Sequence, residues 1–401
     1  MAQFLRYFTC IVLGLSLGLS ITLVGKENAE KYQTQPSYAQ LMDVINTVET
    51  YYVDEISQQT LIQAAIDGIF AKLDPYSAFL DQEAFDELVD TNRGEYFGFG
   101  IEIATENEQV TIISPFPHSP AANAGILPGD KIVKVNQESI NPKRLDTVLK
   151  QIKFHSRHNL AIHLSLSRPN SRELIDVTLK PGFIDVNSVS GELLEGGIGY
   201  IKLANFQDDS TQDMIKQLDQ WQDKALTGLI LDLRNNPGGL LDQAIEIADL
   251  FLAKGRIVST NGRFFDANAD YFASPHNIFS KVPIIVLINK GSASASEVLA
   301  AALQENQRAT LMGEKSFGKG TVQSLIPTLI EGNAIKLTIA HYSTPKGKDI
   351  HSIGIEPDIK ISSDTMTANE NVPIIENLSP HDEVAQDKLV NLAITWIKTN
   401  T

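Results

Sequence analysis

The sequence has almost no cysteine, no excess of basic residues and one long apolar run, which lies at its N-terminus. The single cysteine, Cys10, excludes a disulfide within the chain and any metal site built from several thiolates. The net charge of −16 argues against nucleic acid as a partner, because phosphate binding needs clustered lysine and arginine. With 43% apolar and 20% charged residues, the 401-residue chain can nevertheless bury the cores of two or three domains.

The one long apolar run covers residues 7–25, which carry no charge. A run of this length and position is typical of a signal peptide or of a membrane helix. The sequence ITLVGKENAE at its end is a poor cleavage site, which favours an uncleaved anchor. We therefore expect residues 1–27 to be a signal peptide or membrane anchor. The rest of the chain is then exported, to the periplasm or another extracytoplasmic space, and held at the inner membrane.

The hydrophobic periodicity divides the remaining chain into four segments. Residues 28–93 repeat apolar positions every three or four residues, which predicts helices, with a turn at Asp74 and a third helix, DQEAFDELVD, capped by Asp81. Residues 94–182 alternate apolar and polar residues between prolines and glycines, which predicts a small β module. In residues 183–361, strand patterns alternate with helix patterns, which predicts a partly parallel sheet covered by helices. Residues 362–401 read as a polar linker followed by an amphipathic helix.

A dense group of serines follows the apolar run VPIIVLI, in the stretch NKGSASASEVLAAAL at residues 289–303. Ser294 and Glu297 fit a capping box, in which side chains bind the free amides at a helix N-terminus. The same amides and the helix dipole can stabilise a nucleophile or an oxyanion. Taken alone, the stretch favours the capping role, since no histidine lies nearby to act as a base.

Two further glycine-containing stretches are ambiguous on their own. GEKSFGKGTVQ places Lys319 in a near match to a phosphate-binding loop. Nucleotide binding is disfavoured because Gly320 stands where that loop needs Ser or Thr, and because TVQSLIPTLI predicts a strand where a helix should follow. LDLRNNPGG, at residues 231–239, is at least a turn after a buried strand, and its glycines can bring bare amides close to a ligand.

Together, and in this order, these stretches resemble the C-terminal processing peptidase family of serine proteases, also called tail-specific proteases. YYVDE, AAIDGIFAKLDPYSAFL and FDELVDTNRGEYFGFGIEI are similar to the helical lead-in of the family, and SPAANAGILPGDKIVKVN is similar to the core of a PDZ domain. LILDLRNNPGGLL, GSASASE, GEKSFGKGTVQ and AIKLTIAHYSTPKGKDIHSIGIEPDI are similar to its protease core. The resemblance covers nearly the whole chain after residue 27. It implies an α/β multidomain protein: an N-terminal helical segment, a PDZ-like β module, and a mixed α/β protease core of crotonase-like type.

The resemblance implies a catalytic dyad of Ser294 and Lys319, with Gln323 orienting the lysine. Its oxyanion hole would combine the amide of Ala295 with that of a glycine, and both Gly238 and Gly239 stay open. Physical chemistry agrees with the dyad. Burial lowers the pKa of a lysine, so that a neutral Lys319 could take the proton of Ser294 without any metal or other cofactor.

PDZ domains bind an extended C-terminus by adding it as a strand to a sheet edge. The match gives this sequence a carboxylate-binding loop and a peptide-pairing strand made of Phe97, Gly98, Phe99, Gly100, Ile101 and Ile103. The implied partners are protein or peptide substrates with apolar C-termini and the membrane; a homo-oligomer or an activating adaptor stays open. A β module that merely packs on the protease is the plainer alternative for this domain.

Two other functions stay open at this point. One is a non-catalytic PDZ adaptor on a protease-like fold, against which the complete set of Ser294, Lys319 and Gln323 argues. The other is a Ser-Lys amidase that acts on cell-wall peptides. The PDZ module disfavours the amidase, because such modules present protein tails.

Overall fold

The computed structural model describes residues 38–400, apart from 107–108, 117, 128, 141–144, 169–170, 172, 276–280, 330–331, 362–383 and 385–386. The segment expected to be an anchor, residues 1–27, lies outside the described part of the chain. Among the described helices, none has the length and apolar character needed to span a bilayer. The chain divides into two compact units, Met1–Phe79 and Leu80–Thr401.

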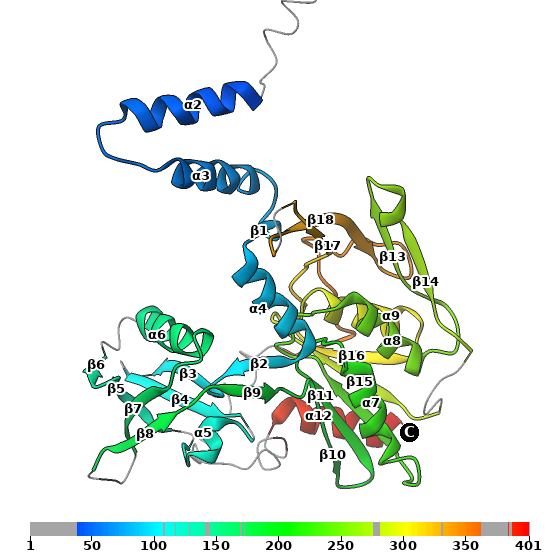
Figure 1. Ribbon diagram of the computed structural model, residues 1–401. Coiled ribbons are helices and arrows are strands. Elements are labelled where there is room, and N and C mark those ends of the chain that lie inside the picture. Colours follow the sequence, from blue (N-terminus) through cyan, green and yellow to red (C-terminus); the bar gives the residue numbers. More distant parts are fainter. Residues whose placement is uncertain are drawn as a thin grey trace, which may run out of the picture. The chain divides into compact units, whose positions relative to one another are not determined.

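The first unit contains the two helices that the three- and four-residue spacing predicts, α2 (Tyr38–Tyr51) and α3 (Gln58–Phe70) (Figure 1). Ser57 caps α3, since its hydroxyl accepts the amide of Thr60 at 3.2 Å. The expected turn at Asp74 also forms, because the Asp74 carboxylate accepts the amide of Ser77 at 2.9 Å. The short strand β1 (Ala78–Leu80) marks the boundary of the unit.

The second unit begins with α4 (Gln82–Arg93), which starts after the predicted cap Asp81 and runs beyond the predicted DQEAFDELVD to Arg93. The Asp81 carboxylate accepts the amide of Ala84 at 2.9 Å, and Gly94 ends the helix in the left-handed conformation at φ 74°. After Gly94 the chain enters β2 (Glu95–Gly98), which pairs antiparallel with β9 (Gly182–Asp185). These two strands therefore bracket the β module between them.

The β module is an antiparallel sheet in the order β3-β4-β5-β7-β8, with β6 beside β5. Its elements are β3 (Ile101–Glu106), β4 (Gln109–Pro115), α5 (Pro120–Asn123), β5 (Lys131–Val135), β6 (Glu138–Ser139), α6 (Leu145–Arg157), β7 (Ile162–Ser167) and β8 (Ile175–Leu179). Its core is formed by buried apolar side chains such as Phe99, Ile112, Ile132 and Leu164.

Two features of this module differ from the sequence pattern. The alternation in GFGIEIAT is typical of one strand, but the chain breaks between β2 and β3, where Gly100 adopts φ 74° in the segment that the PDZ resemblance gives as the carboxylate-binding loop. A side chain at Gly100 would also place its Cβ 2.1 Å from that of Ser119. The helix α6 was not predicted, although its apolar residues Val148 and Ile152 are buried in the module core at helical spacing.

The protease core is built on a six-stranded sheet in the order β10-β11-β12-β15-β16-β19. Its strands are β10 (Val189–Leu194), β11 (Ile198–Leu203), β12 (Gly228–Asp232), β15 (Ile284–Ile288), β16 (Ala309–Gly313) and β19 (Ile359–Lys360). All neighbouring pairs from β11 to β19 are parallel, whereas β10 runs antiparallel at one edge. This is the partly parallel sheet that the alternating pattern predicts.

Helices cover both faces of this sheet (Figure 1). Leu229, Leu231 and Val286 point into one core with α7 (Ser210–Asp219), α8 (Leu241–Phe251) and α9 (Ala295–Glu305). Ile230, Ile285 and Leu287 point into a second core with α12 (Lys388–Asn400), which is red in Figure 1. The alternation follows from the two-residue period of a strand, so both faces need apolar residues and the strands read as continuous apolar runs.

A second, antiparallel sheet joins β17, β18, β13 and β14 in that order. Its elements are β13 (Arg256–Gly262), η1 (Phe265–Ala267), β14 (Ala269–Phe272), β17 (Thr321–Pro327) and β18 (Ala334–Ser343). The loop that carries Lys319, called the lysine loop below, spans residues 314–320 between β16 and β17. Because β17 begins directly after it, this sheet fixes the C-terminal end of the lysine loop.

Candidate active site

The three stretches singled out in the sequence follow three adjacent parallel strands. RNNPGG comes after β12, SASASE after β15, and the lysine loop after β16. Because the carboxyl ends of neighbouring parallel strands meet at one edge of the sheet, the fold brings these loops together. Segments far apart in the sequence thus form one site.

Two of the three serines hold the loop itself in place. The Ser292 hydroxyl donates to the carbonyl of Leu233 at 2.8 Å, and the Ser296 hydroxyl donates to the carbonyl of Asn236 at 2.9 Å. Both serines are fully buried. Their hydroxyls therefore add a second hydrogen bond to each of these carbonyls and join the serine turn to the loop after β12.

Ser294 differs from its two neighbours in its backbone. It has φ 56° and ψ −116°, a region that side-chain-bearing residues rarely occupy. Such a conformation costs about 1–3 kcal/mol and persists only where the surroundings enforce it. The residue stands at the turn from β15 into α9, where nucleophiles of other hydrolases occupy similarly strained strand-to-helix turns. The strain singles out Ser294 as a candidate nucleophile.

Glu297 connects the serine turn to the lysine loop. Its Oε2 accepts the amide of Ser294 at 2.8 Å and also the amide of Lys319 at 2.8 Å. The two backbone nitrogens share one oxygen atom, so they lie at most twice 2.8 Å, or 5.6 Å, apart. Its Oε1 accepts the amide of Gly318 at 2.7 Å and the hydroxyl of Ser316 at 2.5 Å. The sequence identified Glu297 only as part of a helix cap.

Lys319 is half-buried, with glycines on both sides. Burial lowers the pKa of its ammonium group, and the positive charge of Lys336 lowers this pKa further, whereas the Glu297 carboxylate raises it. The net direction is downward. A lysine with a lowered pKa is neutral over more of the physiological range, and only the neutral amine can accept a proton.

Gly238 lies directly against the nucleophile turn. A side chain there would place its Cβ 2.8 Å from the Cβ of Ser294 and 3.0 Å from the amide nitrogen of Ala295. Its φ of 104° also favours glycine. The amide of Gly238 donates to the side chain of Asn236 at 2.9 Å, while Gly239 lies beside Phe206 in an isolated parallel bridge. Gly238 thus reaches the site next to Ala295, the first residue of α9, whereas the contact found for Gly239 is with the backbone of Phe206.

Two polar residues of the second sheet complete the surroundings. Gln323 on β17 donates its side-chain amide to the hydroxyls of Thr321 at 2.8 Å and Thr338 at 3.3 Å. Tyr342 on β18 is buried and forms a side-chain hydrogen bond with Ser294. Burial raises the pKa of Tyr342 to about 12, although the bond to Ser294 lowers it, so the phenol stays protonated at neutral pH. Tyr342 lies within AIKLTIAHYSTPKGKDIHSIGIEPDI, which resembles the protease core of the family, but no role was predicted for this residue.

In the β module, strand β3 is the end strand of the sheet, paired on one side with β4. Phe99 is 1% exposed and belongs to the module core, whereas Ile101 and Ile103 are partly buried against it. Phe97 instead packs edge-on against Phe183, with ring centroids 5.0 Å apart. The residues predicted to bind a peptide therefore divide between the core, the open strand and the β2–β9 pair.

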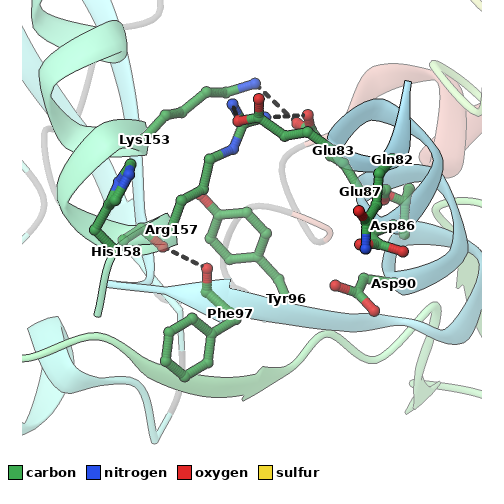
Figure 2. A pocket seen from close by; sticks show the side chains of 12 residues that line it. Gln82, Glu83, Asp86, Glu87, Asp90, Tyr96, Phe97, Lys153, Arg157 and His158 are labelled. Atoms are coloured by element: carbon green, nitrogen blue, oxygen red, sulfur yellow. Dashed lines mark hydrogen bonds and ion pairs between the residues drawn. The ribbon is translucent and has the colours of Figure 1, made fainter. Parts of the chain in front are cut away.

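A cavity of about 560 Å³ lies between α4, β2 and the C-terminal end of α6 (Figure 2). Across it, Glu87 of α4 pairs with Lys153 at 2.9 Å and with Arg157 at 2.7 Å, and Glu83 also pairs with Arg157. The Ser156 hydroxyl donates to the carbonyl of Phe97 at 2.6 Å. These contacts join the helix α6 to the helix α4 and to strand β2.

The fold and this site define a serine peptidase with a PDZ domain, and comparison with known proteins agrees. Residues 197–361 match the model of peptidase family S41, residues 88–166 match the PDZ domain, and residues 15–84 match the N-terminal domain of the activating protease CtpB. A carboxy-terminal-processing protease of Bartonella bacilliformis is 40% identical over 364 residues, which are 89% of this chain and 83% of the relative. The chain therefore belongs to the S41 family of carboxy-terminal processing proteases.

Two further comparisons agree with this assignment. The carboxy-terminal processing protease CtpB of Bacillus subtilis is 34% identical over 322 residues, covering 78% of this chain and 65% of the relative. A solved structure described as an S41 protease from Bacteroides fragilis matches with a TM-score of 0.53 and 15% identity, over 92% of this chain and 98% of the other. At that identity the likeness concerns the fold alone. The predicted family, the α/β multidomain fold class and the serine-peptidase activity are confirmed.

Proposed function

We propose that the protein is an endopeptidase with a Ser294–Lys319 dyad, which cleaves exported protein substrates near their C-termini after its PDZ domain has bound an apolar tail. The observation that carries the dyad is the shared carboxylate of Glu297, which binds the backbone amides of both residues at 2.8 Å. The strained backbone of Ser294 and the lowered pKa of Lys319 support the same assignment.

In the proposed reaction, neutral Lys319 takes the proton of the Ser294 hydroxyl while Oγ attacks the carbonyl carbon of the scissile peptide bond. Ala295 and either Gly238 or Gly239 donate backbone hydrogen bonds to the oxyanion that forms, each worth about 3 kcal/mol of the barrier. The resulting ammonium of Lys319 protonates the leaving amine, and an acyl ester remains on Ser294. Water, deprotonated by the same lysine, then hydrolyses the ester and restores the serine. In this reaction Gln323 orients the side chain of Lys319.

The PDZ domain, proposed to span residues 94–182, takes the C-terminus of the substrate as an extra strand along β3. The open edge of β3 supports this mode, because strand addition needs unpaired backbone groups. The carboxylate is bound at the amides around Gly98, Phe99 and Gly100, and apolar side chains of the tail contact Ile101 and Ile103. The protease core, proposed to span residues 183–361, cleaves the bound chain.

Export follows from the N-terminal sequence. The uncharged run at residues 7–25 supports a signal peptide or an anchor in the inner membrane, with the bulk of the chain on the extracytoplasmic side. The substrates are then exported proteins with apolar C-termini.

The test is digestion of an unfolded protein that carries an apolar C-terminus, with products identified by mass spectrometry. Ser294→Ala and Lys319→Ala should each abolish cleavage, and the double variant should lose little more, because the two residues act as a unit. Ser292→Ala and Ser296→Ala are the matched controls, since their hydroxyls bind Leu233 and Asn236 and take no part in the chemistry. They should keep substantial activity while losing some stability, because each variant removes only one of the several bonds that hold the turn at Ser294. An inactive but folded Ser292→Ala with an active Ser294→Ala would overturn the assignment.

A further inference from the structure

The first turn of the C-terminal helix α12 is tied to the loop that follows β12. The Asp387 carboxylate caps this helix, because its Oδ1 accepts the amides of Leu389 at 2.8 Å and Val390 at 3.1 Å. Its other oxygen, Oδ2, pairs with Nη2 of Arg234 at 2.7 Å. Asp387 thus has two separate roles, one for each oxygen atom.

Arg234 is held between two carboxylates. Its Nε and Nη2 also bind Asp232, at 2.9 and 2.5 Å. Asp232 is 2% exposed and accepts the hydroxyl of Tyr200 at 2.9 Å as well. A buried carboxylate such as that of Asp232 is stable only when charged and polar partners surround it. Its need for a partner therefore fixes Arg234 at the end of β12. Asp387 binds the outer end of the Arg234 guanidinium group.

The turn at Arg234 is hydrogen-bonded to the turn that carries Ser294, the nucleophile turn. The amide of Arg234 donates to Asp232 at 2.9 Å, which closes this turn. The carbonyl of Leu233 accepts the Ser292 hydroxyl at 2.8 Å, and the carbonyl of Asn236 accepts the amide of Ala293 at 3.0 Å. Any shift of the Arg234 turn would therefore move both the glycines of the proposed oxyanion hole and the backbone around Ser294.

We propose that Asp387 is a positioning residue for catalysis: through Arg234 it holds the loop after β12 in register with the nucleophile turn. Asp387 lies beyond residues 197–361, which match the S41 family model, so the C-terminal helix contributes to the active site from outside that region. Without Asp387, Arg234 keeps its bonds to Asp232 and the loop keeps its backbone bonds, but the loop is less closely confined. Turnover should then fall, while substrate binding, which depends on other surfaces, should change little.

The decisive variant is Asp387→Asn in the full-length protein. Asparagine caps a helix as well as aspartate does, so α12 should stay folded, but the charge that faces Arg234 is removed. Asp387→Ser removes the same charge and is also a good cap. The matched control is Ile397→Val, which trims a side chain of α12 that is 1% exposed and packs over Gly228, away from Arg234.

We expect both Asp387 variants to lower kcat by about fivefold to twentyfold with KM within twofold of the wild type, the scale on which positioning contacts act. Labelling of Ser294 by a phosphonofluoridate should slow by the same factor, because the probe needs the nucleophile and the oxyanion site together. Ile397→Val should lower the midpoint of thermal unfolding but leave kcat and labelling unchanged. All rates are measured well below the unfolding midpoints of the variants.

Unchanged kcat and labelling in both Asp387 variants would overturn the inference, as would an equal loss of kcat in Ile397→Val. The positioning role of Asp387 rests on the proposed dyad only because Ser294 is the residue that is labelled. The two proposals can therefore fail separately. If the wild type is not labelled at Ser294, the dyad proposal fails. If the wild type and Asp387→Asn are labelled at Ser294 at the same rate, the positioning role of Asp387 fails while the dyad stands.

Discussion

Replacing Glu297 by glutamine tests how the dyad is held, because the change removes a charge without changing the shape of the side chain. Glu297 is 0% exposed and accepts four hydrogen bonds, two on each oxygen. Glutamine keeps one acceptor oxygen and has an NH2 group in place of the other. The backbone amides of Ser294, Lys319 and Gly318 can only donate hydrogen bonds, whereas the Ser316 hydroxyl can also accept one. The less costly orientation therefore turns the NH2 towards Gly318 and Ser316, and the remaining oxygen still accepts the other two amides.

In that orientation the amide of Gly318 loses its partner, and the two bonds to Ser294 and Lys319 lose the negative charge that strengthens them. An unsatisfied buried N–H costs about 1–3 kcal/mol, so we expect the free energy of unfolding to fall by about 2–3 kcal/mol. The protein should remain folded at 25 °C, since a domain of this size has more stability than that. The loss is measurable by denaturant titration.

The pH dependence of activity gives the sharper result. The Glu297 carboxylate stabilises the ammonium form of Lys319 and so raises its pKa, against the lowering effect of burial. Removing the carboxylate charge should therefore lower this pKa further. Because Lys319 must be neutral to act as a base, kcat/KM rises with pH through its pKa, and this rise should move to lower pH in Glu297→Gln. The plateau at high pH should fall at the same time, since the dyad is less well held.

The measurement is kcat/KM on a peptide substrate from pH 5 to 10, under conditions where chemistry limits the rate. Glu356→Gln is the matched control, because Glu356 pairs with Lys315 and Lys360 at the surface and does not act on Lys319. This variant should leave unchanged both the plateau of kcat/KM at high pH and the pH at which kcat/KM rises. A rise at the wild-type pH or above it in Glu297→Gln would refute the reasoning that the Glu297 charge acts on a lysine base.

Three further predictions concern the same molecule. Ser294→Gly should be inactive yet more stable than Ser294→Ala by about 1 kcal/mol in denaturant titrations, because glycine adopts φ 56° without strain; equal stabilities would mean that the turn is not strained. Lys319→Met should raise the unfolding midpoint at pH 7. The folded-state pKa of Lys319 lies below its unfolded value, so the wild type gains stability as the pH rises between the two, and the advantage of Lys319→Met should disappear by about pH 10. An advantage that is constant with pH would contradict this sign. Amidating the C-terminus of a substrate with an apolar tail should weaken its binding by about 1.5–3 kcal/mol, measured by calorimetry, and slow its cleavage, whereas equal cleavage of the free and amidated forms would remove the proposed role of the PDZ domain.

The sequence predicted much of the fold because the local signals agree with the tertiary structure. Asp81 caps α4 as expected, and the alternation of strands and helices after residue 182 does form a partly parallel sheet. The helix α6 was missed because its polar residues and its place among alternating strands made the β pattern dominate. The alternation through Gly100 is broken because this glycine adopts a left-handed backbone, which a two-residue hydrophobic period does not reveal.

The sequence motifs predicted the main residues of the candidate site but not the contacts that hold them. The order of motifs identified Ser294, Lys319 and the glycines after β12, and the parallel sheet explains why these stretches meet. The contacts of Glu297 with the lysine loop, of Tyr342 with Ser294 and of Asp387 with Arg234 join residues that are distant in the sequence. Such contacts depend on how two sheets and a C-terminal helix pack, and neither periodicity nor propensity specifies that packing.

The density of serines in GSASASE has a physical explanation in the strain at Ser294. A conformation that costs about 1–3 kcal/mol must be enforced on both sides, or the turn would relax. Ser292 and Ser296 enforce it by donating to Leu233 and Asn236, and Glu297 does so from the helix by accepting the amide of Ser294. Each of these bonds is buried; a hydrogen bond to a carbonyl contributes about 0.5–1.5 kcal/mol and one to a carboxylate about 1.5–3 kcal/mol. The flanking hydroxyls and the carboxylate together exceed the strain, so Ser294 stays in a conformation that it would otherwise leave.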